Sequence, residues 1–294
     1  MEPSETAAHA IEALRIQQVN PLGVPGKGRR TLGKATSVEV DTMASLETVG
    51  YEPVGLVTGS SAYEIPLVGR WANYKQNAEV EVFTHGLHQA RLSSLKRMRH
   101  AAVALGADGI VDIDFELLRI PKDGNEVRFN ATGLAVRTGD NSLLQPRKDS
   151  TQNPFTTNLN GHDFALLVRA GYLVVGMVVG VCVFHVGRRD MATTLRNLPR
   201  NTELTVITEA LYQSRELAMS RMQQEAFSVD TDGILGARVE EHTHAWGTRV
   251  IEFVAVGTGI ELVTDQHQLL HPSVVLPLVD GDTSRQHGSD SGPR

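Results

Sequence analysis

Thr84-His85-Gly86-Leu87-His88-Gln89-Ala90-Arg91 and Thr208-Glu209-Ala210-Leu211-Tyr212-Gln213-Ser214-Arg215 are two versions of one segment, 124 residues apart in the chain. The same offset continues without a gap through the residues that follow. It aligns Arg97-Met98 with Arg221-Met222, Asp108-Gly109-Ile110 with Asp232-Gly233-Ile234, and Phe129, Ala131 and Gly133 with Phe253, Ala255 and Gly257. Repeats of this length are typical of tandem domains and not of solenoids, whose units are shorter. The sequence therefore predicts two consecutive domains of one type.

Length and composition agree with two globular domains. The chain has 294 residues, of which 41% are hydrophobic and 21% are charged, and each copy of about 100 residues can bury a core. The net charge of −6 argues against nucleic-acid binding, which usually requires a basic surface. Cys182 is the only cysteine, which excludes an internal disulfide or a cysteine-based zinc site and suits a reducing, cytoplasmic location.

No segment is expected to act as a signal peptide or to span a membrane. The first residues are acidic and polar, whereas a signal peptide is basic and then apolar. The most apolar stretch runs from Tyr172 to Val186. It is shorter than the roughly 20 residues that a spanning helix needs, and its valines and spaced glycines favour a strand.

The first copy is predicted to occupy residues 38–140. Apolar residues recur every three or four positions from about Val80 to Leu105, which indicates an amphipathic helix. Gly106 is expected to end this helix in a left-handed conformation. The other expected elements are strands at Tyr51 to Thr58, Ile110 to Ile120 and Val127 to Arg137, with a turn at residues 122–125.

The second copy is predicted to occupy residues 163–264 in the same order. Its expected elements are a strand at Phe164 to Val168, a strand at Tyr172 to Val186, a helix at about Leu204 to Val229, and a hairpin of Ile234 to Glu241 with Arg249 to Glu261. Residues 141–162 are a predicted polar linker. Residues 1–37 and 265–294 are predicted tails, and the first contains a candidate amphipathic helix at Ala7 to Gln18.

Each copy is thus predicted to be a small α+β domain of order β-α-β-β. One long helix covers one face of a small antiparallel or mixed sheet, so the other face must be solvated or covered by a neighbour. Units of this kind commonly complete their cores by association. The second copy in the same chain offers one such neighbour.

Three stretches of the first copy resemble the YbjQ family, small proteins that carry a heavy-metal-binding label. They are the glycine-containing strand at residues 50–59, the helix exit Leu105-Gly106-Ala107-Asp108-Gly109-Ile110-Val111, and the final strand Ala131-Thr132-Gly133-Leu134-Ala135-Val136. The second copy matches more weakly, with Val229-Asp230-Thr231-Asp232-Gly233-Ile234 at the exit. The resemblance implies a small α+β fold that assembles as a pentameric ring, and it implies no established reaction.

The compact pair His242 and His244 is a candidate metal site. On a strand, this spacing places both rings on one face, but zinc needs three or four ligands and no third ligand stands at a complementary spacing. The alternative is an exposed hairpin. His85 and His88 can share one face of the first long helix, where the alternative is an interfacial or exposed pair without a ligand.

Other recurring polar residues favour structural roles. Asp108 and Asp232, each followed by glycine, suit the turn from helix to strand. Asp112, Asp114 and Glu116 would form a solvated strand face in the first copy only. The repeated arginines, Arg91 with Arg215 and Arg97 with Arg221, are expected to form salt bridges to a neighbouring subunit, and Cys182 is expected to be a buried, inert thiol.

The sequence therefore favours a non-enzymatic assembly or scaffold protein that needs no cofactor. Its expected partner is itself, as a homopentamer with two stacked or fused five-domain rings. The two copies should occupy separate rings, since two-domain chains cannot fill a five-domain ring. A protein partner could bind through the tails, whereas nucleic acid and membrane are not expected partners. The alternatives are a metal- or small-ligand-binding protein with sites at subunit interfaces, and an enzyme.

Overall fold

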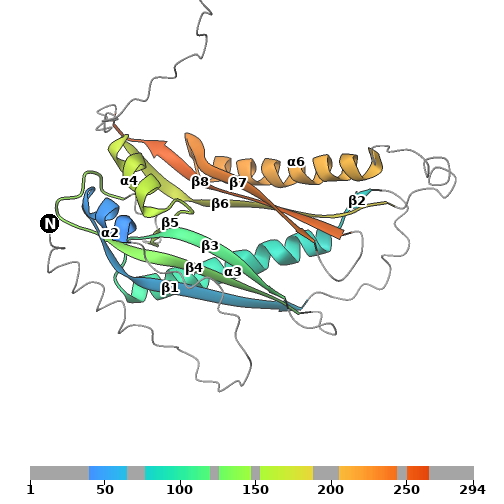
Figure 1. Cartoon of the computed structure of the whole chain (residues 1–294), viewed down its shortest axis with the longest axis horizontal. Helices are drawn as coiled ribbons and strands as arrows, with labels where there is room; N and C mark the ends of the chain where they lie inside the picture. Colours follow the sequence, from blue (N-terminus) through green and yellow to red (C-terminus); the bar gives the residue numbers. More distant parts are fainter. Residues whose placement is uncertain are drawn as a thin grey trace, which may run out of the picture.

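The computed structural model describes residues 40–64, 77–119, 126–146, 153–187, 205–243 and 250–264. Within these ranges the chain forms four helices and two four-stranded sheets (Figure 1). The predicted helix at Ala7 to Gln18, the turn at residues 122–125 and the tail from residue 265 lie outside the described residues. None of the described helices is long and apolar enough to cross a membrane.

The two copies have matching elements, which confirms the predicted α+β tandem repeat. The first copy contains α2 (Val40–Glu47), β1 (Tyr51–Glu64), β2 (Ala78–Glu79), α3 (Glu81–Ala104), β3 (Gly109–Arg119) and β4 (Glu126–Thr138). The second contains α4 (Gly161–Arg169), β6 (Tyr172–His185), α6 (Thr205–Ser228), β7 (Gly233–Thr243) and β8 (Val250–Leu262), preceded by β5 (Phe155–Thr156). The offset is 121 residues between β1 and β6, and 124 residues from the long helices onward.

One predicted element was wrong: the stretch Phe164 to Val168 is helical, not a strand. Asn160 caps α4 by accepting a hydrogen bond from the Asp163 N–H at 2.8 Å, which is a preferred start for a helix. The buried Phe164, Ala165, Leu167 and Val168 then lie on one side of the helix. In the first copy, α2 occupies the corresponding place before the first strand. Each copy therefore has the order α-β-α-β-β.

Each sheet contains one short strand that comes from outside its own copy. Sheet A has the order β1-β4-β3-β5, and sheet B has the order β2-β6-β8-β7. β5, from the segment predicted as a linker, runs parallel to β3. β2 precedes α3 in the first copy but pairs with β6 of the second, with Ala78 opposite His185.

Small details repeat as well, and they explain several of the paired residues in the sequence. The Asp108 carboxylate accepts from the Thr138 N–H at 2.9 Å, and Asp232 accepts from the Leu262 N–H at 2.8 Å. Both aspartates thus fasten the end of the last strand to the helix exit, in agreement with the structural role expected for them. Gly106 has φ 65°, so it ends α3 as predicted.

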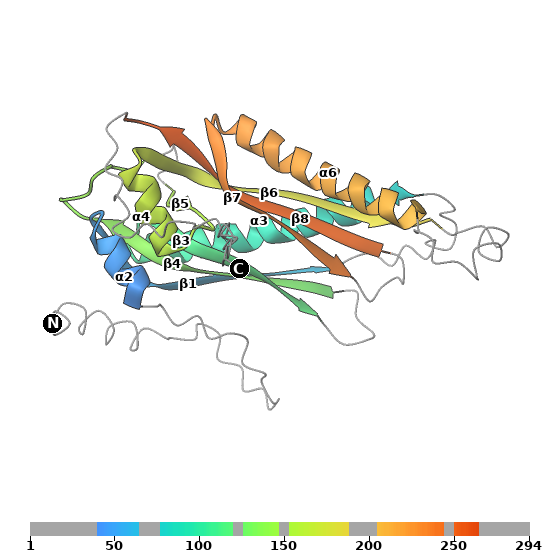
Figure 2. The ribbon, with the colours of Figure 1, turned by 45° about the horizontal axis from the view of Figure 1, so that its top comes forward.

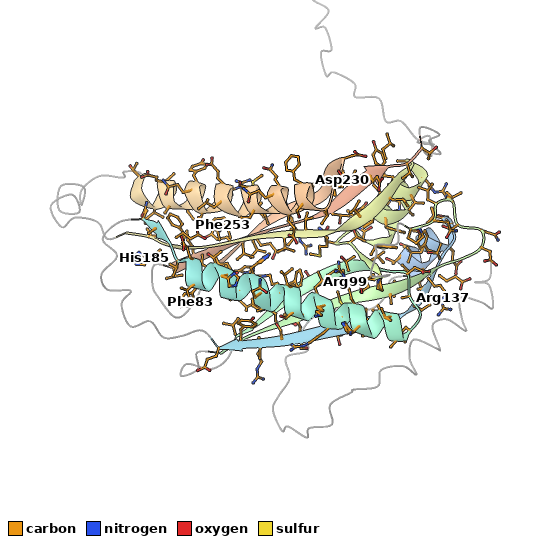
Figure 3. All side chains as sticks on the ribbon, turned by 180° about the vertical axis from the view of Figure 1, so that it is seen from behind. Phe83, Arg99, Arg137, His185, Asp230 and Phe253 are labelled. Atoms are coloured by element: carbon orange, nitrogen blue, oxygen red, sulfur yellow. The ribbon has the colours of Figure 1, made fainter. Side chains whose placement is uncertain are left out.

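The two copies stack in four layers. α3 lies between sheet A and sheet B, and α6 covers the opposite face of sheet B (Figures 1 and 3). At one end α2 and α4 lie side by side (Figure 2), where Tyr51, Phe155 and Phe164 pack with ring centroids 5.0–6.2 Å apart.

The same packing shows that the two copies of one chain pack directly on each other, whereas the arrangement of the copies in rings stays a prediction. A single buried cluster contains Phe83, Leu87 and Leu95 of α3 together with Val179, Val181 and Val183 of β6. Because burial of apolar side chains is the main favourable contribution to folding, the two copies form one joint core. They are direct neighbours within the chain.

Candidate functional site at the junction of the two copies

The contact surface between the copies, called the junction here, begins where β2 adds to β6. The Val80 N–H donates to the Val183 carbonyl at 2.8 Å. The Thr84 hydroxyl, in the first turn of α3, accepts from the Val183 N–H at 2.9 Å and lies 2.8 Å from Glu79 Oε1. The start of α3 is thus fixed to an edge strand of the other copy.

Glu79 also forms a two-fold hydrogen-bonded ion pair with Arg221 of α6. The two guanidinium nitrogens lie 2.6 and 2.9 Å from the two carboxylate oxygens, and one of them also donates to the Val181 carbonyl at 2.8 Å. Burial alone would raise the pKa of Glu79, but the hydrogen bonds from Arg221 and Thr84 and the Arg221 charge lower it. Bidentate pairs of this type fix orientation as well as adding energy.

A second ion pair is buried deeper in the junction. Arg91 of α3 reaches Glu252 of β8 at 2.7 Å, and both side chains are almost fully enclosed. The Arg91 guanidinium also lies 4.4 Å from the centroid of the Phe129 ring, a cation–π contact. A buried pair with both partners present has its charges compensated, whereas either charge alone would be costly.

An open cleft of about 610 Å³ lies beside the Glu79–Arg221 pair. Its polar lining includes Glu81, His85 and His88 from the first copy and Gln224 and Glu225 from the second. Burial lowers the pKa of His88, and the nearby Arg91, His85 and Arg221 lower it further. Burial raises the pKa of Glu225, which accepts from the Val179 N–H at 2.6 Å.

The segment around β5 joins the copies on the other side of α3. The hydroxyls of Thr157 and Thr258 lie 2.7 Å apart, and the Asn158 side chain donates to the Gly236 carbonyl at 2.8 Å. On the surface, Arg238 of β7 bridges to Asp114 of β3 at 3.0 Å. The junction is therefore held by polar contacts along its length as well as by its apolar core.

The predicted metal pair stays a prediction. His242 lies on β7 with its Nε2 3.5 Å from a Glu240 carboxylate oxygen, and hydrogen bonding to His242 is the largest cause of the lowered pKa of Glu240. His244 lies outside the described residues. Among the residues that the structure describes, no three His, Cys, Asp or Glu side chains are grouped so that they could hold a metal ion.

Other candidates are placed plainly by the structure. His85 and His88 both line the junction cleft, so they are interfacial between the two copies. Arg91 and Arg221 form ion pairs, but with the other copy of the same chain and not with another subunit. Cys182 is fully buried in β6, and burial raises its pKa to about 12, as expected for an inert thiol.

Sequence reasoning missed the acidic partners of these arginines, Glu79 and Glu252. For Glu79 a signal was present, because Asn77-Ala78-Glu79 before the first long helix corresponds to Asn201-Thr202-Glu203 before the second. Glu252 had no such signal, since Arg128 stands at the corresponding position of the first copy. A buried ion pair between copies could not be deduced without knowing which sheet covers α3.

Two copies of one small α+β domain, packed through a shared core, define this molecule as a tandem-repeat protein. The sequence model of the YbjQ family, described as "Putative heavy-metal-binding", matches it twice, over residues 42–139 and 169–263. The chain belongs to this family.

Two curated proteins are similar to the chain. The Encapsulin nanocompartment protein of Mycobacterium tuberculosis is 34% identical over 245 residues, which cover 83% of this chain and 91% of that protein. A UPF0145 protein of Thermotoga maritima is 33% identical over 91 residues, 30% of this chain and 82% of that protein. The first relative therefore spans both copies, whereas the second corresponds in length to one.

Proposed function

We propose that this protein is a non-enzymatic, self-assembling structural protein whose chains build a homo-oligomer, as a component of a protein compartment. The similarity to the nanocompartment protein carries this proposal, because it extends over 91% of that relative and includes both copies. A match confined to one small domain would support the fold alone. We place the protein in the cytoplasm, in line with its single, buried cysteine.

The outer face of α6, which no other described part of the chain covers, supports association between chains. In the first copy the corresponding face of α3 is covered by sheet B. On α6, Tyr212 is 62% exposed and Phe227 is 83% exposed, and Ile207 is also exposed. Large apolar side chains that are exposed along such a helix are available for contact with another chain.

The junction chemistry supports a structural role over a catalytic one. Four of its charged residues are used in ion pairs between the copies, Glu79 with Arg221 and Arg91 with Glu252. Catalytic acids and bases, in contrast, must be free to meet a substrate. The charges of the junction instead fix the position of one copy on the other.

The mass of the purified full-length chain in solution tests self-assembly. Five chains of 32.0 kDa, about 160 kDa in total, are expected from the family resemblance. Native mass spectrometry and light scattering over a hundredfold dilution would measure it, with negative-stain microscopy to show whether the particles are closed. A particle of 32 kDa at every concentration would refute self-assembly.

A second function, ligand binding, is favoured by the cleft of about 610 Å³ between the copies. Its two histidines and three glutamates could bind a small cationic molecule, or a metal ion after a rearrangement that brings at least three of them together, since no three are so grouped among the described residues. Metal measured on the same sample after dialysis tests this function. Stoichiometric metal that is lost in a His85→Ala, His88→Ala variant would support it, and metal-free protein that binds no added zinc would refute a metal-binding role.

The tails are a proposed place for a protein partner. Deletion of residues 265–294 should then abolish binding of that partner and leave the mass of the assembly unchanged. Binding that is unaffected by the deletion would contradict this role for the second tail.

A further inference from the structure

The outer edge of β1 corresponds to the outer edge of β6 in the second copy, and the two edges differ in whether a strand is paired with them. In sheet B, the outer edge of β6 is occupied by β2. In sheet A, the described residues place no strand on the corresponding edge of β1. An exposed strand edge presents unpaired N–H and C=O groups and is a template for another strand.

Corresponding residues of β1 and β6 direct their backbone N–H and C=O groups to the same side of the strand. Val183 of β6 lies opposite Glu252, and its counterpart Ala62 of β1 lies opposite Arg128. Because backbone groups alternate between the two sides of an antiparallel strand, Ala62 directs its N–H and C=O to the outer edge, as Val183 does. In sheet B these two groups of Val183 are bonded to Thr84 and Val80.

Arg97 lies at the outer edge of β1, and Arg221 lies at the corresponding edge of β6. Arg221 donates to the Val181 carbonyl and forms its ion pair with Glu79. Arg97 donates to the Ser60 carbonyl, the counterpart of Val181. Its side chain is exposed, and no ion pair forms on it within the described part of the chain. Arg97 at the edge of β1 therefore lacks, among the described residues, the carboxylate that Glu79 supplies to Arg221 at the edge of β6.

The sequence before α6 contains the groups that would complete the site. Glu203 is the counterpart of Glu79, two residues before the start of the long helix in each copy, and Thr208 is the counterpart of Thr84. Thr84 is the hydroxyl that joins Glu79 to the edge strand. The second copy thus repeats both the acid and the hydroxyl.

The occupant must come from a second copy of the chain. α6 begins at Thr205 on the far side of sheet B, and both sheet B and α3 separate it from sheet A (Figure 1). The described start of α6 is therefore remote from β1 of the same chain. The opposite charges of Arg97 and Glu203 match the two surfaces.

The geometry points to a strand-addition site on β1 at which the residues before α6 of a second chain add to the edge and place Glu203 of that chain against Arg97. This inference rests on the proposed self-assembly and names the contact that performs it. The contact is heterologous, because each chain uses its first copy to receive and its second copy to donate. Heterologous contacts build rings when the rotation closes and filaments when it does not.

Charge reversal tests the contact in the full-length chain. Arg97→Glu and Glu203→Arg should each raise the dissociation constant between chains by roughly tenfold or more, because like charges then meet in every contact. The double variant Arg97→Glu, Glu203→Arg should restore assembly. Lys96→Glu is the matched control, since it makes the same charge change on the neighbouring exposed residue and should leave the mass unchanged.

Disulfide trapping supplies a second readout that does not depend on the ion pair. Glu64 and Thr202 correspond to His185 and Ala78, which are Cα partners in sheet B. The variant Glu64→Cys, Thr202→Cys should therefore give a ladder of covalent oligomers on a non-reducing gel. Cys182 is buried and should not contribute, and each single-cysteine variant should give no ladder beyond a dimer.

The outcomes separate this contact from self-assembly itself. A monomeric native chain would refute both. A native oligomer whose mass is unchanged by Arg97→Glu and by Glu203→Arg, without a covalent ladder, would refute the contact and leave self-assembly standing. Circular dichroism of every variant shows whether the fold is kept, and recovery of assembly in the double variant excludes misfolding as the cause of the loss.

Discussion

Gly180 shows how a single missing side chain permits the packing of helix on sheet. An added Cβ would overlap the Ala218 carbonyl oxygen and lie 2.5 Å from the Met222 backbone nitrogen in α6. Gly59 meets α3 at Ser94 and Met98 in the same way. These two glycines therefore permit close approach of helix and strand at corresponding positions of both copies.

Gly180→Ala should destabilise the protein by about 1–3 kcal/mol, because α6 must shift away from β6. Gly176→Ala is the control on the same strand. Its added Cβ would have the Thr156 hydroxyl at 4.0 Å as its nearest neighbour, so it should change stability little. Urea denaturation measures both, and equal effects of the two substitutions would contradict the packing argument.

His88 should make stability depend on pH. Its pKa is lowered by burial and by nearby positive charge, whereas in the unfolded chain it takes up a proton near pH 6.5. The free energy of unfolding should therefore fall as the pH drops below about 6.5, where the unfolded state binds the proton more readily.

His88→Gln should reduce this slope in urea unfolding measured between about pH 7.5 and about pH 5.5. His162→Gln, at an exposed position of α4, is the control and should keep the slope of the native protein. A His88→Gln variant that also keeps the slope would show that other groups are responsible.

At the scale of the elements, α3 and α6 have the same length and aligned sequences but different surroundings. α3 is covered on two sides, by its own sheet and by sheet B, whereas among the described elements only sheet B covers α6 (Figure 3). Their aligned arginines reflect this difference. Arg91 is enclosed with Glu252, and Arg215 is exposed.

Arg91→Met should therefore destabilise the fold by about 3–5 kcal/mol, because it leaves Glu252 buried and uncompensated. Arg215→Met, the same change at the aligned position, should cost within about 0.5 kcal/mol. Thermal and urea unfolding of the two variants provide the comparison. A small effect of Arg91→Met would mean that Glu252 is protonated or reaches solvent in the variant.

At the scale of the whole molecule, the four layers have two unlike outer surfaces. One is the outer face of α6. The other is the face of sheet A opposite α3, where Leu56, Thr58, Ser60 and Arg128 correspond to the apolar Met177, Val179 and Val181 and to Glu252 of the buried junction. A contact between chains that continues the layers would thus be more polar than the junction within the chain.

Arg128 provides a test of this continuation. If chains stack as the copies do, Arg215 of one chain approaches Arg128 of the next, two like charges at the place where Arg91 meets Glu252. Arg128→Gln should then strengthen association, and Arg128→Glu should strengthen it further by roughly tenfold. Dilution series analysed by light scattering would rank the three proteins, and weaker association of Arg128→Glu would contradict this stacking.

Much of the fold could be predicted from the sequence because its signals are local. The spacing of apolar residues in α3 and α6 and the alternation in the hairpins placed these elements within about two residues, the usual uncertainty of helix and strand ends. The short helix α4 was misread because a run of five apolar residues fits a strand or a helix equally well. The Asn160 cap was the signal that could have decided it.

The candidate site could be predicted from the sequence only in part. Arg91 and Arg221 were recognised as residues of an interface, but their interface was assigned to another subunit. For His85 and His88, an interfacial pair was one of the alternatives. Glu79 and Glu252 were not recognised at all, since a salt bridge depends on which elements meet in space. The division into residues 38–140 and 163–264 stays a prediction, and residues 155–156 of the predicted linker form β5 in sheet A.

The amino-acid sequence alone was enough to predict a tandem repeat of one α+β domain, because hydrophobic periodicity, turn residues and the repeat itself can all be recognised along the chain. The three-dimensional structure was needed to show that the copies are neighbours with a joint core, that β2 crosses to the other sheet, and that no described strand pairs with the corresponding edge of β1. These facts depend on which faces come together. The hydrophobic effect is not directional, so the pattern of apolar residues shows which faces are buried but not which faces pack against each other.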